Sequence, residues 1–199
     1  MAGTFPISNS QFSTMGIRTS QDTIITITDS GKKLSRQIDG QRFGFTAQII
    51  TAKRSDVYGE LMAFIMKQRS RKENFTIVPP EVSNARGTVS GTPTGTASAG
   101  DTSITLGGSG SGTLKAGDMI KFENHSKIYM VVEDQSDIST GTLTIEPPLI
   151  NAISSTNIIY DNVPFTVYLT NDIQEFGVVG ADKDGNALYQ FEIDVEEAL

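Results

Sequence analysis

The stretch Arg-Phe-Gly-Phe-Thr-Ala-Gln-Ile-Ile at residues 42–50 carries an apolar side chain at every second position. These positions are Phe43, Phe45, Ala47 and Ile49. Successive side chains of a β-strand point to opposite faces, so this alternation predicts a strand with one buried face. The stretch therefore favours a fold built around a β-sheet.

The residues before this stretch extend the prediction to a β-meander with one buried face. Asp22–Asp29 is dominated by β-branched residues and predicts a strand, and Leu34–Ile38 predicts a second, more polar one. Ser30–Lys33 and the dipeptide Asp39-Gly40 are typical of turns. We expect three consecutive strands in one sheet.

One α-helix is predicted after the meander, at Ser55–Gln68. Ser55 is the expected N-cap, and the basic run Lys67–Lys72 lies near the negative end of the helix dipole. Phe75–Val78 then returns to a strand that stops at a proline pair. The helix prediction rests on apolar residues that share one face: Val57, Leu61, Phe64 and Ile65.

The middle of the chain predicts a small barrel. Gly87–Gly112 is rich in Gly, Ser and Thr and is either a flexible linker or a set of short strands joined by glycine turns. Five short strands with polar turns favour a barrel of the OB-like kind. These five are two strands within Thr113–Phe122 on either side of Gly117-Asp118, then Lys127–Glu133, Thr142–Glu146 and Asn157–Tyr160, and the Gly-rich segment holds a further short strand candidate at Ser103–Leu106.

The last part of the chain returns to simple alternation. Strands are predicted at Phe165–Leu169, Glu175–Val179 and Leu188–Val195, with a hairpin turn at Lys183–Asn186. The predicted fold class is therefore mainly β: a split β-sandwich or barrel domain with one α-helix, plus an inserted small OB-like β-barrel. The split domain comprises residues 1–86 and 161–199, and the insert comprises residues 87–160.

Charge is distributed unevenly along the chain, whose net charge is −7. Residues 1–87 hold 12 Lys/Arg and 7 Asp/Glu, residues 88–160 hold 3 and 7, and residues 161–199 hold 1 and 9. This balance argues against nucleic-acid binding by the protein as a whole. Either the acidic end folds back beside the basic beginning, or a basic face meets an acidic face of a neighbouring subunit.

Composition excludes several classes of protein. The chain has no cysteine, which excludes disulfides and thiolate metal sites. It has no apolar run of about 18–20 residues, so no membrane insertion is expected. Met1–Ser10 lacks the pattern of a signal peptide, so we expect synthesis and folding in a cytoplasm.

The single histidine, His125, is the first residue to test for catalysis. Asp118 and Glu123 are near it in sequence, but no motif links them to a nucleophile. His125 is therefore predicted to lie exposed in the turn Asn124–Ser126. Carboxylates at Glu73, Glu81 and Glu196-Glu197 have no spacing that fixes an acid–base pair.

The metal and phosphate patterns are incomplete. Asp182, Asp184 and Asn186 resemble the start of a calcium loop, but that loop requires Gly at the sixth position and Glu at the twelfth, where this chain has Ala187 and Ile193. The Gly-rich run Gly107–Gly112 is not followed by the Lys-Ser/Thr of a phosphate loop. We therefore expect no enzyme, and no catalytic, cofactor-binding or metal site.

Several longer segments resemble tail proteins of tailed bacteriophages, and the layout resembles the distal tail proteins with an OB-like inserted domain. The likeness spans nearly the whole chain. The segments that carry it are Gln37–Ala47, Ala63–Arg69, Glu73–Pro80, Leu114–Phe122, Val163–Val167 and Asn171–Phe176.

This resemblance implies a structural virion protein that forms a homohexameric ring at the end of the tail tube. The ring would stack on the tube protein and on the tip or baseplate hub, and the insert would project outward to hold fibres or host-surface ligands. DNA must pass through the channel, so part of the acidic segment 161–199 is expected to face it.

Two other functions remain open. The insert is the candidate domain for binding host-surface carbohydrate, although it has no Trp and only Phe122, Tyr129 and Tyr160 as aromatic residues. The chain is alternatively a neighbouring tail part, such as a tube, terminator or baseplate adaptor protein. An enzyme such as a cell-wall hydrolase has no supporting constellation.

Overall fold

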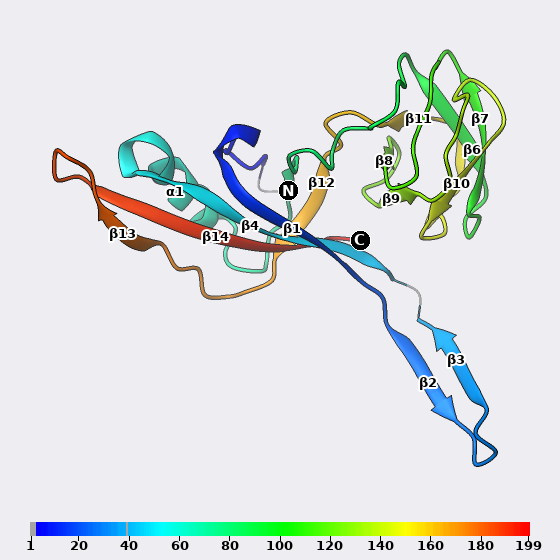
Figure 1. Cartoon of the computed structure of the whole chain (residues 1–199), viewed down its shortest axis with the longest axis horizontal. Coiled ribbons are helices and arrows are strands. Elements are labelled where there is room, and N and C mark those ends of the chain that lie inside the picture. Colours follow the sequence, from blue (N-terminus) through cyan, green and yellow to red (C-terminus); the bar gives the residue numbers. More distant parts are fainter. Residues whose placement is uncertain (1–2, 39) are drawn as a thin grey trace.

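The computed structural model describes residues 3–38 and 40–199. The strands form three assemblies: a six-stranded sheet, a closed barrel of six strands and a separate two-stranded hairpin (Figure 1). Across the described residues there is one α-helix, α1 (Gly59–Lys67), and a short 3-10 turn, η1 (Asn9–Gln11). The predicted mainly β fold with one helix and a small barrel is confirmed.

The six-stranded sheet draws its strands from both ends of the sequence. The long strand β4 (Arg42–Lys53) lies between β1 (Phe12–Ser20) and β14 (Ala187–Glu197), antiparallel to both. On the far side of β14 the sheet continues in two branches. These are β12 and then β5 in one branch, Phe165–Leu169 and Phe75–Ile77, and β13 in the other, Gly177–Ala181.

One face of this sheet forms the larger hydrophobic core. The four apolar residues predicted to be buried on β4 are indeed buried, and β14 continues the same face with Phe191, Ile193 and Val195. Helix α1 packs on this core through Leu61 and Ile65. The opposite face is polar because the alternation that buries one set of side chains exposes the other.

The helix is confirmed, but its predicted start is wrong. A π-helical turn, η2 (Arg54–Tyr58), precedes α1, and the hydroxyl of Ser55 donates to Asp56 rather than to the helix backbone. The chain leaves β4 with Lys53 still extended and enters a wide turn. Ser55 therefore lies inside the helical segment and cannot act as its N-cap.

The barrel has six strands in the closed order β10-β7-β6-β11-β8-β9. The Gly-rich segment is thus ordered, and its strand β6 was not predicted. Thr113–Ala116 is not a strand, since Leu114 makes only an isolated bridge to Gln135. The six strands are β6 (Pro93–Ala97), β7 (Ser103–Gly108), β8 (Met119–Phe122), β9 (Ile128–Val131), β10 (Thr142–Glu146) and β11 (Ile153–Ile159).

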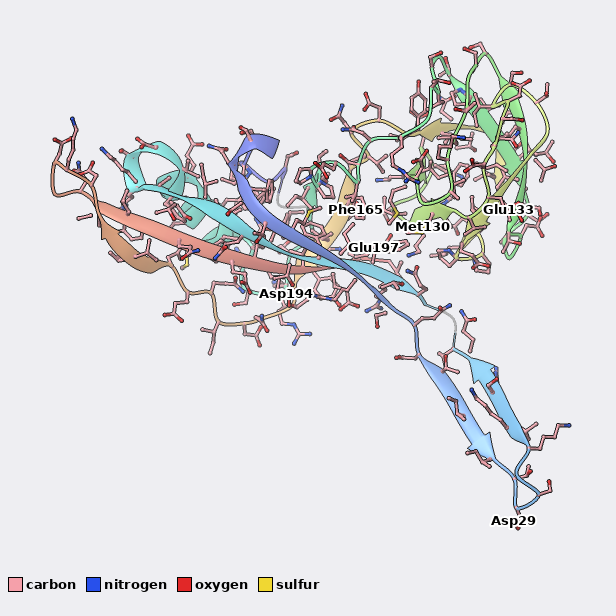
Figure 2. All side chains as sticks on the ribbon, in the orientation of Figure 1. Asp29, Met130, Glu133, Phe165, Asp194 and Glu197 are labelled. Carbon is pink, nitrogen blue, oxygen red and sulfur yellow. The ribbon has the colours of Figure 1, made fainter. Side chains whose placement is uncertain are left out.

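The predicted meander is wrong in its first two strands. β2 (Thr23–Ile27) and β3 (Lys33–Gln37) pair only with each other, and every residue in them is exposed. The hairpin projects away from the sheet (Figure 1), and Asp29 marks its tip in Figure 2. The neighbour of β4 is instead β1, which the sequence did not predict. Of the predicted turn Asp39-Gly40, Asp39 lies outside the described residues.

Charge pairing joins the two ends of the chain. Arg18 pairs with Asp194, Lys53 pairs with Asp182, and Arg42 lies 3.4 Å from Glu196. Each pair links the basic first part of the chain to the acidic last part. The intramolecular interpretation of the uneven charge is therefore confirmed.

Gly95 provides a test of the barrel core. A Cβ atom there would lie 2.8 Å from Ile104 and 3.0 Å from Phe122, which is too close for either side chain. We expect Gly95→Ala to lower the free energy of unfolding by about 1–3 kcal/mol through overpacking. Thermal unfolding followed by circular dichroism measures the change.

The matched control is Gly107→Ala on the neighbouring strand β7. A Cβ atom at Gly107 meets nothing closer than Thr94 at 3.5 Å, an ordinary contact. That variant should be unchanged or more stable by about 0.4–1 kcal/mol, because Ala restricts the unfolded chain. Equal effects at the two positions would contradict the packing described for the barrel.

Candidate assembly surfaces and the barrel–sheet junction

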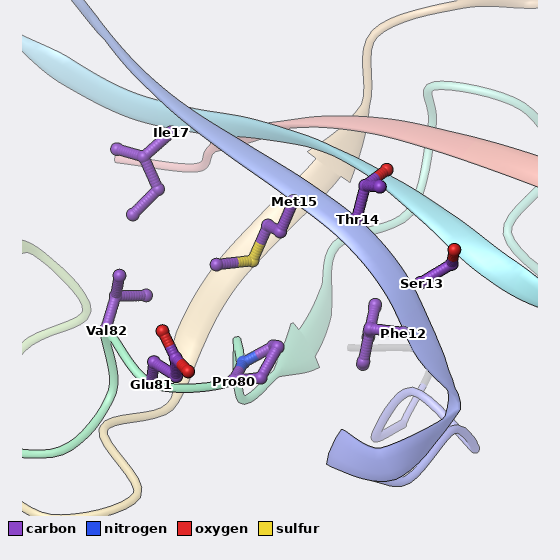
Figure 3. Close-up of a pocket in the computed structure, with 8 residues that line it drawn as sticks. All are labelled: Phe12, Ser13, Thr14, Met15, Ile17, Pro80, Glu81 and Val82. Carbon is purple, nitrogen blue, oxygen red and sulfur yellow. The ribbon is translucent and has the colours of Figure 1, made fainter.

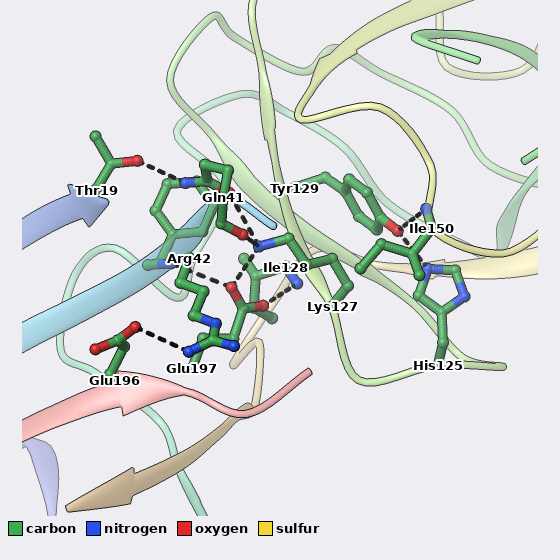
Figure 4. Close-up of polar contacts among 11 residues, drawn as sticks. Thr19, Gln41, Arg42, His125, Lys127, Ile128, Tyr129, Ile150, Glu196 and Glu197 are labelled. Carbon is green, nitrogen blue, oxygen red and sulfur yellow. Dashed lines mark hydrogen bonds and ion pairs between the residues drawn. The ribbon is translucent and has the colours of Figure 1, made fainter. Parts of the chain in front are cut away.

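A buried ion pair joins the barrel to the sheet. Lys127, just before β9, pairs with Glu197 at the end of β14, and the two side chains are 2% and 0% exposed. Glu197 lies between the two assemblies (Figure 2), and Figure 4 shows the contacts around the pair. The pair is therefore the centre of the junction.

Hydrogen bonds satisfy both charges of the pair. The Nζ of Lys127 donates to the main-chain oxygen of Gln41 at 2.8 Å and to its Oε1 at 3.0 Å, and lies 5.0 Å from the centre of the Phe43 phenyl ring. Glu197 accepts from the backbone N–H of Ile128 at 2.6 Å and of Phe43 at 3.2 Å (Figure 4). Lys127 of the barrel thus binds groups of the sheet, and Glu197 of the sheet binds groups of both assemblies.

The electrostatics of the pair favour specificity of docking over net stability. Burial lowers the pKa of the Lys127 ammonium, and the Glu197 carboxylate opposes that shift. Removing two charges from water costs about as much as their attraction returns, unless further hydrogen bonds complete the site. Here those bonds come from Gln41, from Phe43 on β4 and from Ile128 on β9, so both charges are satisfied when the barrel sits in this orientation.

His125 corrects a sequence prediction. It is half-buried rather than exposed, because its imidazole packs against Phe122 and its Nε2 lies 2.8 Å from the hydroxyl of Tyr129. The same hydroxyl accepts from the backbone N–H of Ile150 at 3.2 Å (Figure 4). Burial, and then the charge of Lys121, lowers the pKa of His125. The histidine therefore has a packing role beside the barrel core.

Asp118 and Asp182, two carboxylates considered in the sequence analysis, hold turns of the backbone. Asp118 has a fully buried side chain, which accepts backbone N–H bonds from Arg86 at 3.0 Å and Lys115 at 2.8 Å. The turn of Asp182 is the predicted hairpin turn, with the carboxylate accepting from the backbone of Asp184 and Asn186. Among the described residues no group of three or more His, Cys, Asp or Glu side chains is placed to hold a metal.

Exposed apolar residues define the first candidate assembly surface, the β2–β3 hairpin. Its exposed apolar residues include Ile24, Ile27 and Leu34, and Ile27 is 69% exposed. The sequence indicated these strands from their β-branched composition. It gave no signal that they would lie outside the core, because buried and exposed β-strands share that composition.

A second surface, the β13 groove, lies on the polar face of the sheet. It has a volume of about 420 Å³ and is formed by the segment before β13 together with β13, β14 and β4. Its walls include the carboxylates Glu175 and Glu192 and the apolar side chains Ile173 and Val179. Ile173 is 86% exposed, so this groove is both acidic and apolar.

A third surface, the β1 groove, lies at the edge of the sheet. It has a volume of about 460 Å³ between β1 and the segment Pro80–Val82. Figure 3 shows Phe12, Met15 and Ile17 along one wall and Glu81 on the other. Among residues 3–38 and 40–199 no strand pairs with the outer edge of β1, and this edge adjoins the groove.

These features define a class of β protein in which a small closed barrel is inserted into an open sheet that exposes apolar surfaces. Residues 81–163 match the family model described as distal tail protein pb9, B domain. The match covers less than half of the chain, and it shows that this segment is similar to a domain of a phage distal tail protein.

The match encloses the barrel strands, which run from Pro93 to Ile159. The predicted insert, residues 87–160, lies within the matched range, and its boundaries stay a prediction. Among curated proteins no significant match is found. None of the helices in the described part of the chain has the length and apolar character needed to span a membrane.

We predict that Lys127→Met lowers the free energy of unfolding by about 3–5 kcal/mol, because it leaves Glu197 charged and buried without its partner. The same substitution at Lys115, which pairs with Asp134 on the surface, is the matched control and should change little. Denaturant unfolding measures both. If the two variants are equally stable, the buried pair does not hold the junction.

A pH-dependent prediction concerns Asp194. Burial raises the pKa of this carboxyl, but hydrogen bonds from Thr170 and Arg18 outweigh it and hold the pKa below its usual value. A carboxyl with a lowered folded pKa stabilises the fold above about pH 4, and this contribution is lost as the pH falls. Asp194→Asn should therefore destabilise the protein at neutral pH and flatten its loss of stability towards pH 2.

Asp172→Asn controls for the change of charge, since Asp172 is exposed. Urea unfolding at a series of acidic pH values compares the parent protein with both variants. A profile for Asp194→Asn as steep as that of the parent would contradict the role given to Arg18 and Thr170.

Proposed function

We propose that the chain is a structural ring protein of a phage tail, which joins the tail tube to the tip or baseplate and lets DNA pass. The observation that carries this proposal is the match of residues 81–163 to the B domain of a distal tail protein. The exposed hairpin and the grooves of the sheet support it, since a protein that assembles needs surfaces that are completed by partners.

The shape of the sheet supports a ring. The β2–β3 hairpin and the β13 end of the sheet lie at opposite ends of the same elongated body (Figure 1). Two different surfaces that meet head to tail produce a closed ring when the rotation between subunits closes. We propose six copies, as the resemblance to distal tail proteins implies.

The channel of such a ring must not retain DNA. Segment 161–199 carries nine Asp/Glu and one Lys, so it would repel phosphates rather than bind them. We propose that part of this segment faces the channel. A channel lined with Lys and Arg would contradict this part of the proposal.

The partners of the ring follow from its place in the tail. The ring faces would stack on the tube protein and on the tip or baseplate hub, and the barrel would project outward, where it would hold fibres. The role is structural and requires no catalytic group, cofactor or metal. It also involves no sequence-specific contact with nucleic acid.

Binding of host-surface carbohydrate by the barrel is the alternative that the structure supports least. Stacking on sugar requires exposed aromatic faces, but Phe122 and Tyr129 are fully buried in the barrel core. Tyr160 is half-buried, and its hydroxyl donates to Gly91.

A tube, terminator or adaptor role differs from the proposed one only in where the ring sits.

The mass and shape of the purified protein test the proposal. Native mass spectrometry and negative-stain imaging are expected to show a hexamer with a central hole wide enough for duplex DNA, about 20 Å across, and an outer set of lobes from the barrels. A protein that stays monomeric at high concentration and binds glycans on an array would overturn the ring proposal in favour of the carbohydrate alternative.

A further inference from the structure

We propose that Lys127 and Gln41 condense into an isopeptide bond that ties the barrel covalently to the sheet, with Glu197 as the base that moves the protons. The three side chains meet at the barrel–sheet junction (Figure 4). This modification takes place within one chain, so it goes beyond the proposed ring and does not depend on it.

The nucleophile and the amide are already in contact. The Nζ of Lys127 donates to the Oε1 of Gln41 at 3.0 Å, which brings it within reach of the carbonyl carbon Cδ. It also donates to the main-chain oxygen of Gln41 at 2.8 Å, so two hydrogen bonds hold the lysine at this residue. Groups that are held together in a fixed geometry react much faster than the same groups free in solution.

The amide of Gln41 is held from its other side as well. Its Nε2 donates to the Oγ1 of Thr19, a residue of β1, at 2.6 Å (Figure 4). Gln41 is itself only 7% exposed. The amide is therefore fixed between β1 and the lysine, with its carbonyl towards the Nζ of Lys127.

Glu197 is placed to act as the base. Its Oε2 accepts directly from the Nζ of Lys127, and the backbone N–H groups of Phe43 and Ile128 hold the carboxylate in position. A carboxylate in hydrogen-bond contact with an amine can take its proton and pass a proton on to a leaving group. The junction thus holds a nucleophile, an amide and a base in mutual contact.

Burial favours the reactive form of the lysine. The side chains of Lys127 and Glu197 are 2% and 0% exposed, and the Nζ lies 5.0 Å from the centre of the Phe43 ring. Burial lowers the pKa of Lys127 although the Glu197 carboxylate opposes the shift, so a larger fraction of the amine is neutral and nucleophilic. Lys115 lacks these conditions, since its side chain is 47% exposed and its Nζ contacts Asp134.

The atoms of the reaction balance within the three side chains. The ammonium of Lys127 first gives a proton to Glu197, and the neutral Nζ attacks the Cδ of Gln41. Glu197 then passes its proton to Nε2 and takes a second one from Nζ. The new Nζ–Cδ bond remains, the Cδ–Nε2 bond breaks and ammonia leaves. Glu197 keeps one proton, so both charges of the pair are neutralised.

The product is a covalent loop between residues that lie 86 positions apart in sequence. A cross-link restricts the unfolded chain, and it does so more strongly when the loop is long. The bond also replaces two charges that are costly to bury with neutral groups. The barrel would then stay tied to the sheet wherever its non-covalent contacts open.

Isotope-resolved mass spectrometry of the full-length chain, folded at neutral pH and then denatured, tests the bond. We expect a mass lower than that of the sequence by one ammonia. Trypsin should fail to cleave after Lys127 and should release a branched peptide in which this residue is joined to the segment 37–42. A chain that keeps its full mass after prolonged incubation would overturn the inference. Loss of one water would instead indicate an amide between Lys127 and Glu197, and would contradict the role of Gln41.

Three substitutions separate the roles of the side chains. Gln41→Met removes the amide, and Lys127→Arg removes the nucleophile while keeping the charge, so neither folded variant should lose ammonia. Glu197→Gln keeps the size of the side chain but not the base, and should form no bond between residues 41 and 127. Lys115→Arg, on the surface, is the matched control and should lose ammonia as the parent does.

Circular dichroism establishes which variants are folded. Glu197→Gln leaves the Lys127 ammonium buried without its counter-charge and can unfold the junction. Gln41→Met keeps the ion pair and decides the question in that case. A folded Gln41→Met variant that still loses ammonia, or a folded Glu197→Gln variant that forms the bond between residues 41 and 127 as fast as the parent, would overturn the assignment.

Discussion

The pairing of β4 with β14 is the constraint on which the rest of the structure depends. Arg42–Lys53 and Ala187–Glu197 are far apart in sequence, yet they form the long antiparallel ladder at the centre of the sheet. The chain between these two strands also supplies β5, β12 and β13 of the same sheet, and the barrel lies between β5 and β12 in sequence. At the end of the same ladder, Glu197 meets Lys127 and fixes the orientation of the barrel.

The sequence revealed those elements whose signal is local. Strict alternation marked β4 and β12, and the period of apolar residues marked the helix, since both patterns need only a few neighbouring residues. β1 was missed because Phe12, Met15 and Ile17 do not follow strict alternation. β6 was missed because its residues are small, and its burial comes from side chains of neighbouring strands that pack against Gly95.

The functional surfaces were harder to predict because they depend on contacts between distant residues. Lys127 and Glu197 are 70 positions apart, and nothing near either residue indicates the other. The sequence also gives no sign that the hairpin is exposed, because Ile24, Ile25 and Ile27 are equally typical of a buried strand. The uneven charge along the chain was the one sequence signal of such contacts. The structure accounts for part of it by ion pairs within the chain.

The buried pair holds the barrel against the sheet, while the hairpin and the grooves stay exposed. We propose that this chain forms the ring between tube and tip. A cryo-electron microscopy reconstruction of the intact phage tail tests this most directly. We expect density for six copies between tube and tip, with the sheets around the channel and the barrels outside. Finding the chain elsewhere in the tail, or the barrels lining the channel, would contradict it.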